Sequence, residues 1–473
     1  MPTLPPPRRP RALHLSCLLG GALALSACAS WQAAPPAPAS AGPDLAYVVL
    51  GEQGERVART LSAGPCPALD VDGQSQPMQM RAAAGVLPLR NTSVPDAHNK
   101  AAAFPSNVCE LRLAPGVRQV RLHGAALPLP PQEVKRIVVL GDTGCRLRGA
   151  AVQDCNDATA WPFALVAKAA AQWKPDLVLH VGDYHYRETP CPEGRAGCKD
   201  SPYGFGEDVW RADFLHPARP LLAAAPWVMV RGNHESCMRG GQGWWRLLDP
   251  RPLLPGRDCI RPADDAQGDF SPVYATPLGG DAQVLVWDSS AAPHGLPPSA
   301  DPRHARYAEN YRQLDKLSNQ ATYNFMLSHH PLLGFYVEPK AGGKSQIQPG
   351  NPLLQQVFRQ HNPYMLTPPR VQALLAGHVH TWQQLSFSSG HPSHFIAGHS
   401  GSMIDELHLP NVLPADTRPA PEAAVHSHAS YGGYGFMTME REGADRWKIG
   451  VYDYEGKLQR TCVMENRSST CAP

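Results

Sequence analysis

Five short segments of this 473-residue chain bring together residue types that bind metal ions and move protons. They are Gly-Asp-Thr-Gly at 141–144, Gly-Asp-Tyr-His-Tyr at 182–186, Gly-Asn-His-Glu at 232–235, His-His-Pro at 329–331 and Gly-His-Val-His at 377–380. Taken singly, such a segment is more often an ordinary turn than a functional site. Taken together, they supply carboxylates, imidazoles, an amide and a phenol, which are hard and borderline ligands suited to Fe, Zn or Mn. The set therefore predicts a metal centre.

Two adjacent metal ions would allow such a site to hydrolyse a phosphate ester. A carboxylate can span two ions about 3.5 to 4 Å apart. The pair of ions acidifies a bound water to hydroxide near neutral pH, and it neutralises the phosphate oxygens as charge develops. The metal-bound hydroxide attacks phosphorus in line, and the leaving oxygen then needs a proton or a hydrogen bond.

Short apolar runs of the kind that form buried strands lead into these segments. Strands are predicted at 137–140, 177–181, 227–230, 284–287, 325–327 and 373–375, with helical periodicity between them at 163–173 and 306–317. This alternation is typical of a layered α/β domain, here a β-sandwich flanked by helices. Because ligands of α/β folds bind beyond the carboxyl ends of strands, the segments are expected to converge there.

A different pattern precedes this region. From residue 44 to about 129 the sequence reads as short strands, with apolar and polar residues alternating through Cys109, Leu111 and Leu113 and a turn at 114–116. We therefore predict a small all-β domain at 44–130, which a proline-rich connector ends, and a catalytic domain at 131–473.

The first 28 residues have the pattern of an export signal, with arginines at 8, 9 and 11 before a mostly apolar stretch at 13–25. Leu-Ser-Ala-Cys at 25–28 resembles the lipobox of bacterial lipoproteins, which implies a lipid on Cys28. Ala29 follows rather than Asp, and this resembles the pattern for sorting to the outer membrane, facing the periplasm. Residues 29–43, rich in Ala and Pro, are interpreted as a tether. The alternatives are an ordinary cleaved signal and a membrane span, for which the stretch is shorter than the roughly 20 residues required.

Ten cysteines remain after Cys17 and Cys28 are set aside. An even number of cysteines in an exported chain indicates disulfides, and their clustering suggests near-neighbour pairs. The suggested pairs are Cys66 with Cys109, Cys145 with Cys155, and Cys191 with Cys198. A zinc-binding cysteine cluster is the weaker alternative, because no paired C-x-x-C knuckles occur.

The net charge of +2, from 43 basic and 41 acidic residues, gives no electrostatic argument for binding nucleic acid or an anionic membrane surface. The predicted partner is a small phosphorylated substrate, and contact with the membrane is expected through the lipid anchor only. The sequence carries no signal for the oligomeric state.

From about residue 136 to 380, the order and composition of the five segments resemble those of the calcineurin-like metallophosphoesterases. That family usually has Asp-x-His in the first segment, where the His binds a metal, but here Gly144 stands at the position of the His. Tyr186, three residues after Asp183, can replace the missing ligand with a phenolate. This paired departure resembles the purple acid phosphatases, in which a tyrosinate binds ferric iron.

The resemblance implies two metal ions that share one ligand: Fe(III), and a divalent partner that is Fe, Zn or Mn. The implied ligands are Asp142, Asp183, Tyr186 and His380 for the ferric ion, and Asp183, Asn233, His329 and His378 for the divalent ion. Asp183 would bridge the two ions, and His329 is preferred over His330 because the family pattern is His-x-Pro.

His234 is the candidate that assists the leaving oxygen, because its neighbour Asn233 would place it at the edge of the metal site. The alternative is a structural histidine bonded to Glu235. Arg231, His185 and His330 are possible substrate contacts, each about as well explained by an ion pair or by packing.

We therefore predict a dinuclear-metal hydrolase that cleaves phosphate monoesters, similar to an acid phosphatase and exported to the bacterial cell envelope. One alternative is a phosphodiesterase of the same fold. The other is a non-catalytic envelope lipoprotein that binds metal or phosphate; the presence of every expected ligand argues against it.

Overall fold

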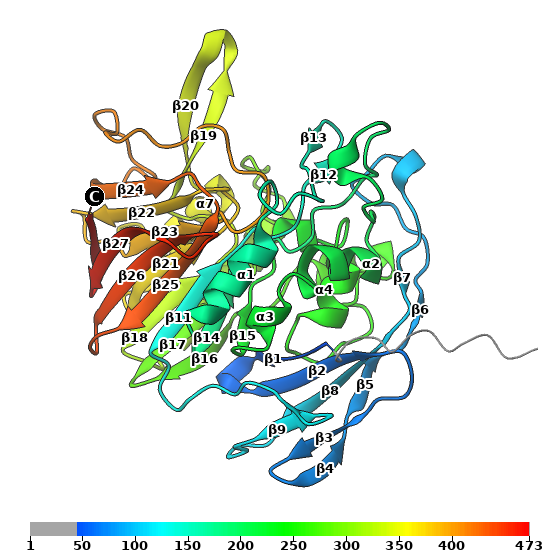
Figure 1. Ribbon diagram of the computed structural model, residues 1–473. Coiled ribbons are helices and arrows are strands. Elements are labelled where there is room, and N and C mark those ends of the chain that lie inside the picture. Colours follow the sequence, from blue (N-terminus) through cyan, green and yellow to red (C-terminus); the bar gives the residue numbers. More distant parts are fainter. Residues whose placement is uncertain (1–44, 473) are drawn as a thin grey trace, which may run out of the picture. The chain divides into compact units, whose positions relative to one another are not determined.

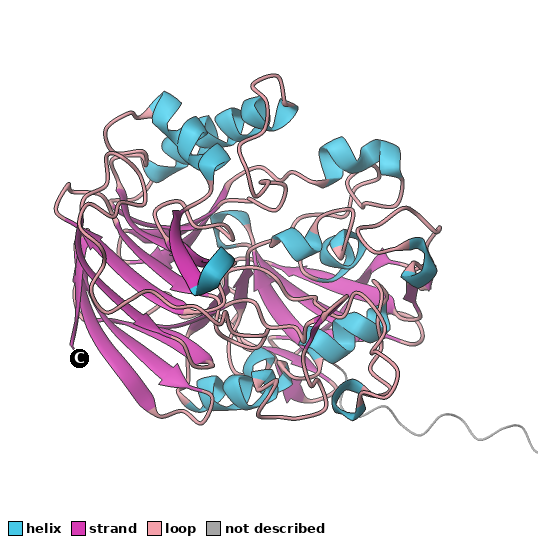
Figure 2. Ribbon diagram, turned by 90° about the horizontal axis from the view of Figure 1, so that it is seen from above, coloured by secondary structure: helices cyan, strands magenta, loops and turns pink. Residues whose placement is uncertain are grey.

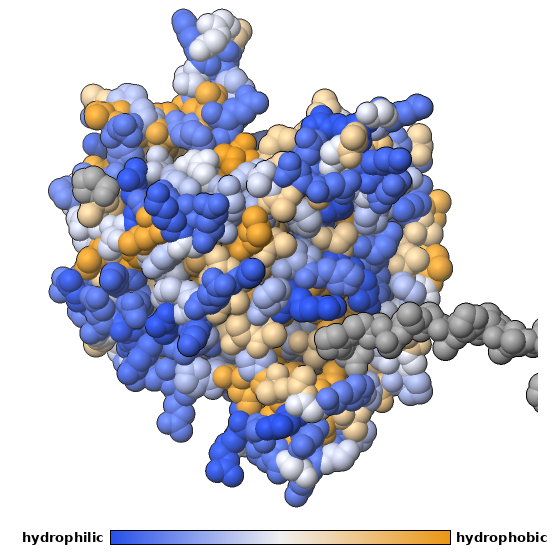
Figure 3. Space-filling view, viewed as in Figure 1, coloured by the Kyte–Doolittle hydropathy of each residue, from blue (hydrophilic) through white to orange (hydrophobic). Residues whose placement is uncertain are grey.

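The computed structural model describes residues 45–472 (Figure 1). The signal peptide at 1–28, the lipid site at Cys28 and the tether at 29–43 lie outside the described residues. Among the described residues, the helices are too short or too polar for any of them to cross a bilayer. On the face in Figure 3, hydrophilic residues predominate and small apolar clusters lie between them.

Two large β-sheets form the centre of the molecule. The first has the strand order β28-β27-β26-β25-β11-β14-β15-β1-β2-β8-β5. Its strands are β1 (Ala46–Leu50), β2 (Arg56–Ser62), β5 (Gln79–Ala82), β8 (Asn107–Leu113), β11 (Arg136–Leu140), β14 (Leu177–His180), β15 (Trp227–Met229), β25 (Gly435–Arg441), β26 (Arg446–Asp453), β27 (Leu458–Glu465) and β28 (Ser468–Ala472). Strands β11, β14, β15 and β1 are parallel, and the neighbours outside them are antiparallel.

The second large sheet has the order β16-β17-β18-β21-β23-β22-β24. Its strands are β16 (Tyr274–Gly279), β17 (Ala282–Val286), β18 (Tyr323–Leu327), β21 (Val371–Ala376), β22 (Trp382–Phe387), β23 (Ser393–Ala397) and β24 (Val425–Tyr431). Strands β17, β18, β21 and β23 are parallel.

Helices cover the outer faces of both sheets, as Figure 2 shows from above. They are α1 (Phe163–Gln172), α2 (Glu207–Trp210), α3 (Arg219–Leu222), α4 (Gly241–Leu247), α5 (Asp265–Gly268), α6 (Pro302–Ser318) and α7 (Pro352–His361). The smaller sheets pair β3 (Ala68–Val71) with β4 (Gln74–Pro77) and β9 (Val120–Leu122), β9 with β10 (Ala125–Ala126), β6 (Gly85–Val86) with β7 (Ala103–Phe104), β12 (Leu147–Arg148) with β13 (Ala151–Val152), and β19 (Phe335–Lys340) with β20 (Lys344–Pro349).

The side-chain alternation of the strands builds this layering. In β11, Ile137 and Val139 belong to the core between the two sheets, while Val138 and Leu140 belong to the core shared with α1 and α3. Because successive side chains of a strand point to opposite faces, a strand covered on both faces must be apolar throughout. The predicted strands and the two predicted helices are confirmed, as is the fold class of a helix-flanked β-sandwich preceded by an all-β region.

Between residues 45 and 126 the described chain is all-β apart from two 3₁₀ turns. Four of its strands continue the first sheet, because β1 pairs in parallel with β15 through Val49 and Trp227. The division into two domains at about residue 130 stays a prediction.

The ten cysteines between residues 45 and 472 form five disulfides: Cys66–Cys109, Cys145–Cys155, Cys191–Cys198, Cys237–Cys259 and Cys462–Cys471. The first three are the suggested pairs. Disulfides persist in oxidising compartments and are rare in the cytosol. The protein is therefore suited to an exported, non-cytoplasmic location.

A buried charge cluster joins the N-terminal strands to the segment after α4. Glu110 on β8 accepts hydrogen bonds from Arg59 at 2.8 Å and Arg81 at 3.0 Å. Both arginines also donate to main-chain carbonyls of that segment, including Asp249 O. Burial raises the pKa of Glu110, but Arg59 and Arg81 together lower it below its ordinary value of 4.5.

This cluster predicts a pH-dependent contribution to stability. The carboxyl pKa is lower in the folded than in the unfolded state, so its contribution is present above about pH 4.5 and is lost as the pH falls below that value. We expect Glu110→Gln to lower the free energy of unfolding by about 3 kcal/mol at pH 7, because two buried cations lose their partner. Denaturant unfolding of the oxidised protein should show that the difference in unfolding free energy between the original and the Glu110→Gln protein becomes smaller at pH 4 and below. A difference that does not change with pH would contradict the prediction. The matched control is Glu309→Gln, which removes the charge of an exposed pair with Arg312.

Candidate metal centre

Five of the predicted ligands lie two to four residues after the carboxyl ends of parallel strands. Asp142 follows β11, Asp183 follows β14, Asn233 follows β15, His329 follows β18 and His378 follows β21. The first three strands belong to one sheet and the last two to the other, so the site lies where the sheets meet at one end of the sandwich.

The turns that carry these ligands have unusual backbone conformations. Asp142, Asp183 and His378 have φ of 55°, 59° and 70°, a left-handed region that side chains other than glycine rarely adopt. Close approach of the chains requires Gly232, since a Cβ there would lie 2.0 Å from Asp183 Oδ1. Strain of this kind persists where the surrounding structure holds a functional geometry.

Four of the predicted ligands form a first cluster around the phenol of Tyr186. Its hydroxyl donates to Asp142 Oδ1 at 2.9 Å or to Asp183 Oδ2 at 3.0 Å, and it lies 2.9 Å from His380 Nε2. His380 Nε2 also lies 3.3 Å from Asp142 Oδ1. The four side chains therefore present their ligand atoms to a common centre.

Three further side chains and the same aspartate form a second cluster. Asn233 Oδ1 lies 2.9 Å from His329 Nε2 and 3.0 Å from His378 Nδ1. His329 Nε2 lies 3.1 Å from Asp183 Oδ2. The structure thus brings all seven predicted ligands together in two sets, and Asp183 contacts both.

The chemistry of these donors fits a pair of cations. Burial, Asp142 and Asp183 together raise the pKa of Tyr186 well above 10, so the free phenol stays protonated. A bound cation reverses this balance, because it favours the deprotonated form of a coordinating group. Two carboxylates, a phenolate and an imidazole are a set that suits a hard ion such as Fe(III), and the amide and two imidazoles suit a divalent ion.

Gly144 has no room for a side chain. A Cβ at this position would lie 2.7 Å from Tyr184 O and 2.9 Å from Tyr186 N. Asp213 holds the same place by accepting the N–H groups of Tyr186 at 2.7 Å and Cys145 at 3.1 Å. The turn that delivers the Tyr186 phenol therefore occupies the space that a histidine at residue 144 would need.

His234 lies at the edge of both clusters. Its ring centroid is 3.9 Å from that of Tyr186, and its Nε2 is 3.8 Å from Asp183 Oδ2. Its Nδ1 lies 2.9 Å from Glu188 Oε1 and 2.9 Å from His185 O. Burial and Arg239 lower the pKa of His234 to about 3. The contacts at Nδ1 orient the ring, and Nε2 lies on the side of the shared aspartate, where Arg239 Nη2 is 2.6 Å away.

Glu235 is not the partner of His234. Its carboxylate accepts main-chain N–H groups of Asp183 at 3.1 Å, Tyr184 at 2.9 Å, His185 at 3.2 Å and Gly232 at 3.0 Å. It therefore fixes the two turns that carry Asp183 and Asn233 against each other.

Two of the three candidate substrate contacts face away from the clusters. Arg231 is buried, and its guanidinium pairs with Asp288 at 2.7 Å. His185 is fully buried against Phe205, and its ring lies 2.7 Å from Gly204 O. These contacts turn both side chains away from the ligand clusters, where a phosphate would bind.

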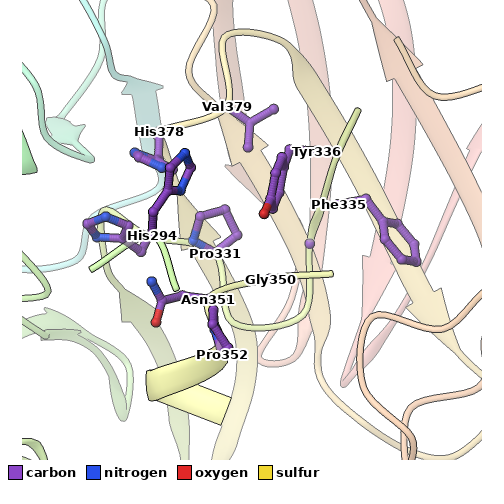
Figure 4. A pocket seen from close by; sticks show the side chains of 11 residues that line it. His294, Pro331, Phe335, Tyr336, Gly350, Asn351, Pro352, His378 and Val379 are labelled. Atoms are coloured by element: carbon purple, nitrogen blue, oxygen red, sulfur yellow. The ribbon is translucent and has the colours of Figure 1, made fainter. Parts of the chain in front are cut away.

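His330 lies beside the second cluster, with its ring centroid 4.3 Å from that of His378. Both residues line a pocket with His294, Tyr336 and Asn351, of which Figure 4 labels all but His330. Tyr336 is the second residue of β19, in the hairpin β19–β20, which projects from the molecule at the top of Figure 1. The pocket adjoins the side of the site formed by Asn233, His329 and His378, where the organic part of a substrate would find apolar and aromatic walls.

Sequence reasoning missed four residues that shape the site. Glu188 contacts His234, Asp213 holds the Tyr186 turn, and Asp405 Oδ2 accepts the His380 N–H at 2.9 Å. The guanidinium of Arg146 lies over the Tyr186 ring, 4.7 Å from its centroid. Glu188 and Arg146 each lie two residues after one of the five segments, at Tyr186 and Gly144; the contacts of Asp213 and Asp405 arise from the folded chain.

Comparison with known proteins places these observations in context. The sequence model described as calcineurin-like phosphoesterase matches residues 135–382. No curated protein matches the sequence. A purple acid phosphatase, PPD1, from seeds of yellow lupin (Lupinus luteus) is similar in structure at 14% identity, with a TM-score of 0.50 over 90% of this chain and 73% of that chain. The structure of PhoD is similar at 12% identity, with a TM-score of 0.50 over 90% of this chain and 91% of that one. At these identities the likeness shows the fold alone.

Proposed function

Because the chain belongs to the calcineurin-like phosphoesterase family, we propose that it hydrolyses small phosphate monoesters at a dinuclear centre of Fe(III) with Fe, Zn or Mn. The observation that carries this proposal is the Tyr186 phenol within 3.0 Å of Asp142, Asp183 and His380, beside a residue 144 that has no side chain. The first ion would be held by Asp142, Asp183, Tyr186 and His380, and the second by Asp183, Asn233, His329 and His378.

When bound, the two ions supply an acidified water as nucleophile and offset the charge of the phosphate oxygens. The side chains of the site have the complementary tasks. Asp183 would link the two sets of ligands, since it contacts Tyr186 of the first set and His329 of the second. His234 would hydrogen-bond the leaving oxygen from Nε2 of its protonated ring, a form that the negative charge of a bound phosphate favours, while Glu188 and His185 O contact Nδ1. His330 would contact the substrate from the pocket side.

We also propose that the enzyme acts in the bacterial cell envelope, anchored through Cys28 to the outer membrane and facing the periplasm. The five disulfides support an exported location.

The proposal is tested by comparing a chromogenic phosphate monoester with the matching diester, using oxidised, metal-replete protein. We expect the monoester to have the higher kcat/KM by at least about tenfold, a difference of about 1.4 kcal/mol in transition-state stabilisation. Removal of the metals with a chelator should abolish turnover, and added iron with zinc or manganese should restore it. Cleavage of the diester alone would leave a phosphodiesterase of the same family. No cleavage of either ester by protein that holds two metals would favour a binding protein.

A further inference from the structure

Arg146 carries a charge that no carboxylate neutralises. Three nearby arginines are paired: Arg148 and Arg239 with Glu188, and Arg187 with Asp213. Within residues 45–472, no carboxylate oxygen lies in ion-pair distance of Arg146. Its guanidinium instead lies over the ring of Tyr186, and its Nη2 is 3.5 Å from His380 Nε2. An unpaired cation at the rim of a site for anionic substrates attracts an anion.

The main chain of Arg146 is held firmly in place. Its N–H donates to Gln153 Oε1 at 3.0 Å, and its C=O accepts the Gln153 N–H at 2.8 Å. The buried Gln153 side chain also donates to Gly401 O at 2.9 Å and to the Tyr434 hydroxyl at 3.0 Å. The disulfide Cys145–Cys155 closes the same loop. Because the main chain of Arg146 is already fixed, it loses little conformational entropy when the residue binds a ligand.

We propose that Arg146 binds a non-bridging phosphate oxygen of the substrate on the side of Tyr186 and His380, and that this contact selects monoesters over diesters. A guanidinium forms strong, paired hydrogen bonds with phosphate oxygens. A monoester is a dianion with three non-bridging oxygens, whereas a diester is a monoanion in which one of these oxygens carries a second organic group. The contact therefore stabilises the monoester more. This inference rests on the proposed monoesterase function and names the residue that would decide its substrate class.

The test uses Arg146→Met, which keeps an unbranched apolar stem without the charge, and Arg146→Lys, which keeps the charge without the planar fork. Arg195→Met is the control, because Arg195 is an exposed arginine paired with Asp154, which lies in the loop that Cys145–Cys155 closes. We expect Arg146→Met to lower kcat/KM for the monoester about 30-fold and for the diester less than about threefold. Binding of inorganic phosphate to the metal-replete protein, measured by calorimetry, should weaken about tenfold. Arg146→Lys should recover part of both losses, and the control should match the unsubstituted protein.

The phosphate titration separates this inference from the proposed function. Suppose that the unsubstituted enzyme cleaves monoesters, and that Arg146→Met binds phosphate and discriminates between the two esters as well as the unsubstituted enzyme does. The role proposed for Arg146 is then excluded, and the proposed function is kept. If the enzyme cleaves only diesters, the proposed function fails, and with it the selection of monoesters. Equal losses for both esters with unchanged phosphate binding and metal content would show that Arg146 only supports the Tyr186 ring.

Discussion

The Asp183→Asn protein is expected to lose at least about 10³-fold in kcat for a phosphate monoester, a barrier increase of about 4 kcal/mol, while it keeps its fold. A single oxygen of Asp183 contacts ligand atoms of both sets, because Oδ2 lies 3.0 Å from the Tyr186 hydroxyl and 3.1 Å from His329 Nε2. Its Oδ1 also accepts the His234 N–H at 2.8 Å. An amide cannot place a charged oxygen between two cations, so the substitution removes the link between the two halves of the site.

Metal content and circular dichroism should be measured on the same preparation. We expect the Asn protein to hold fewer than two metals per chain with an unchanged spectrum. The exposed Asp96→Asn is the matched control, since it makes the same chemical change outside the site. An Asn protein that kept two metals and activity within tenfold of the original would exclude a shared role for Asp183.

His234→Ala should lower turnover in a way that depends on the leaving group. A group that protonates or hydrogen-bonds the leaving oxygen contributes roughly 10²- to 10⁴-fold, and it matters most when the departing alcohol is a poor leaving group. We therefore expect a loss of about 10³-fold for an alkyl phosphate and about tenfold for a nitrophenyl phosphate. Nε2 lies 3.8 Å from Asp183 Oδ2, so the imidazole is at the edge of the proposed ligands, where it could reach a phosphate bound to them.

The measurement is a series of aryl and alkyl phosphates with alcohols of rising pKa. The slope of log kcat against that pKa should be steeper for the Ala protein than for the original. His426→Ala, an exposed histidine on β24, controls for the loss of an imidazole elsewhere. Parallel slopes with a uniform loss would mean that His234 positions the substrate and transfers no proton.

The convergence of the seven proposed ligands was predictable because each lies in a short segment that follows an apolar strand, and strand ends of a layered α/β fold meet by topology. Strand order does not predict whether the side chains of Arg231 and His185 face the site. Neighbours along an extended chain point to opposite sides, and His185, next to Tyr186, faces Gly204 O. Arg231, two residues before Asn233, pairs with Asp288, a residue that is distant in the sequence. Asp213, in a π-helical turn, and Asp405, in a loop, lie 27 and 25 residues from their partners Tyr186 and His380, and no local pattern marks such contacts.

The pairing of β11 with β25 has a consequence for how the protein matures. The strand that carries Asp142 lies between β14 and β25, and residues 136–139 pair with residues 437–440, about three hundred positions later in the chain. The Asp142 turn is held from the same late region, because Ser402 N–H donates to Asp142 O at 2.7 Å. Contacts of such long sequence separation form slowly during folding. A chain still emerging from a ribosome or a secretion channel therefore has no assembled centre. Hydrolysis is expected to begin only after almost the entire polypeptide has been delivered. In a refolding experiment, the onset of activity would report formation of the native topology rather than early collapse.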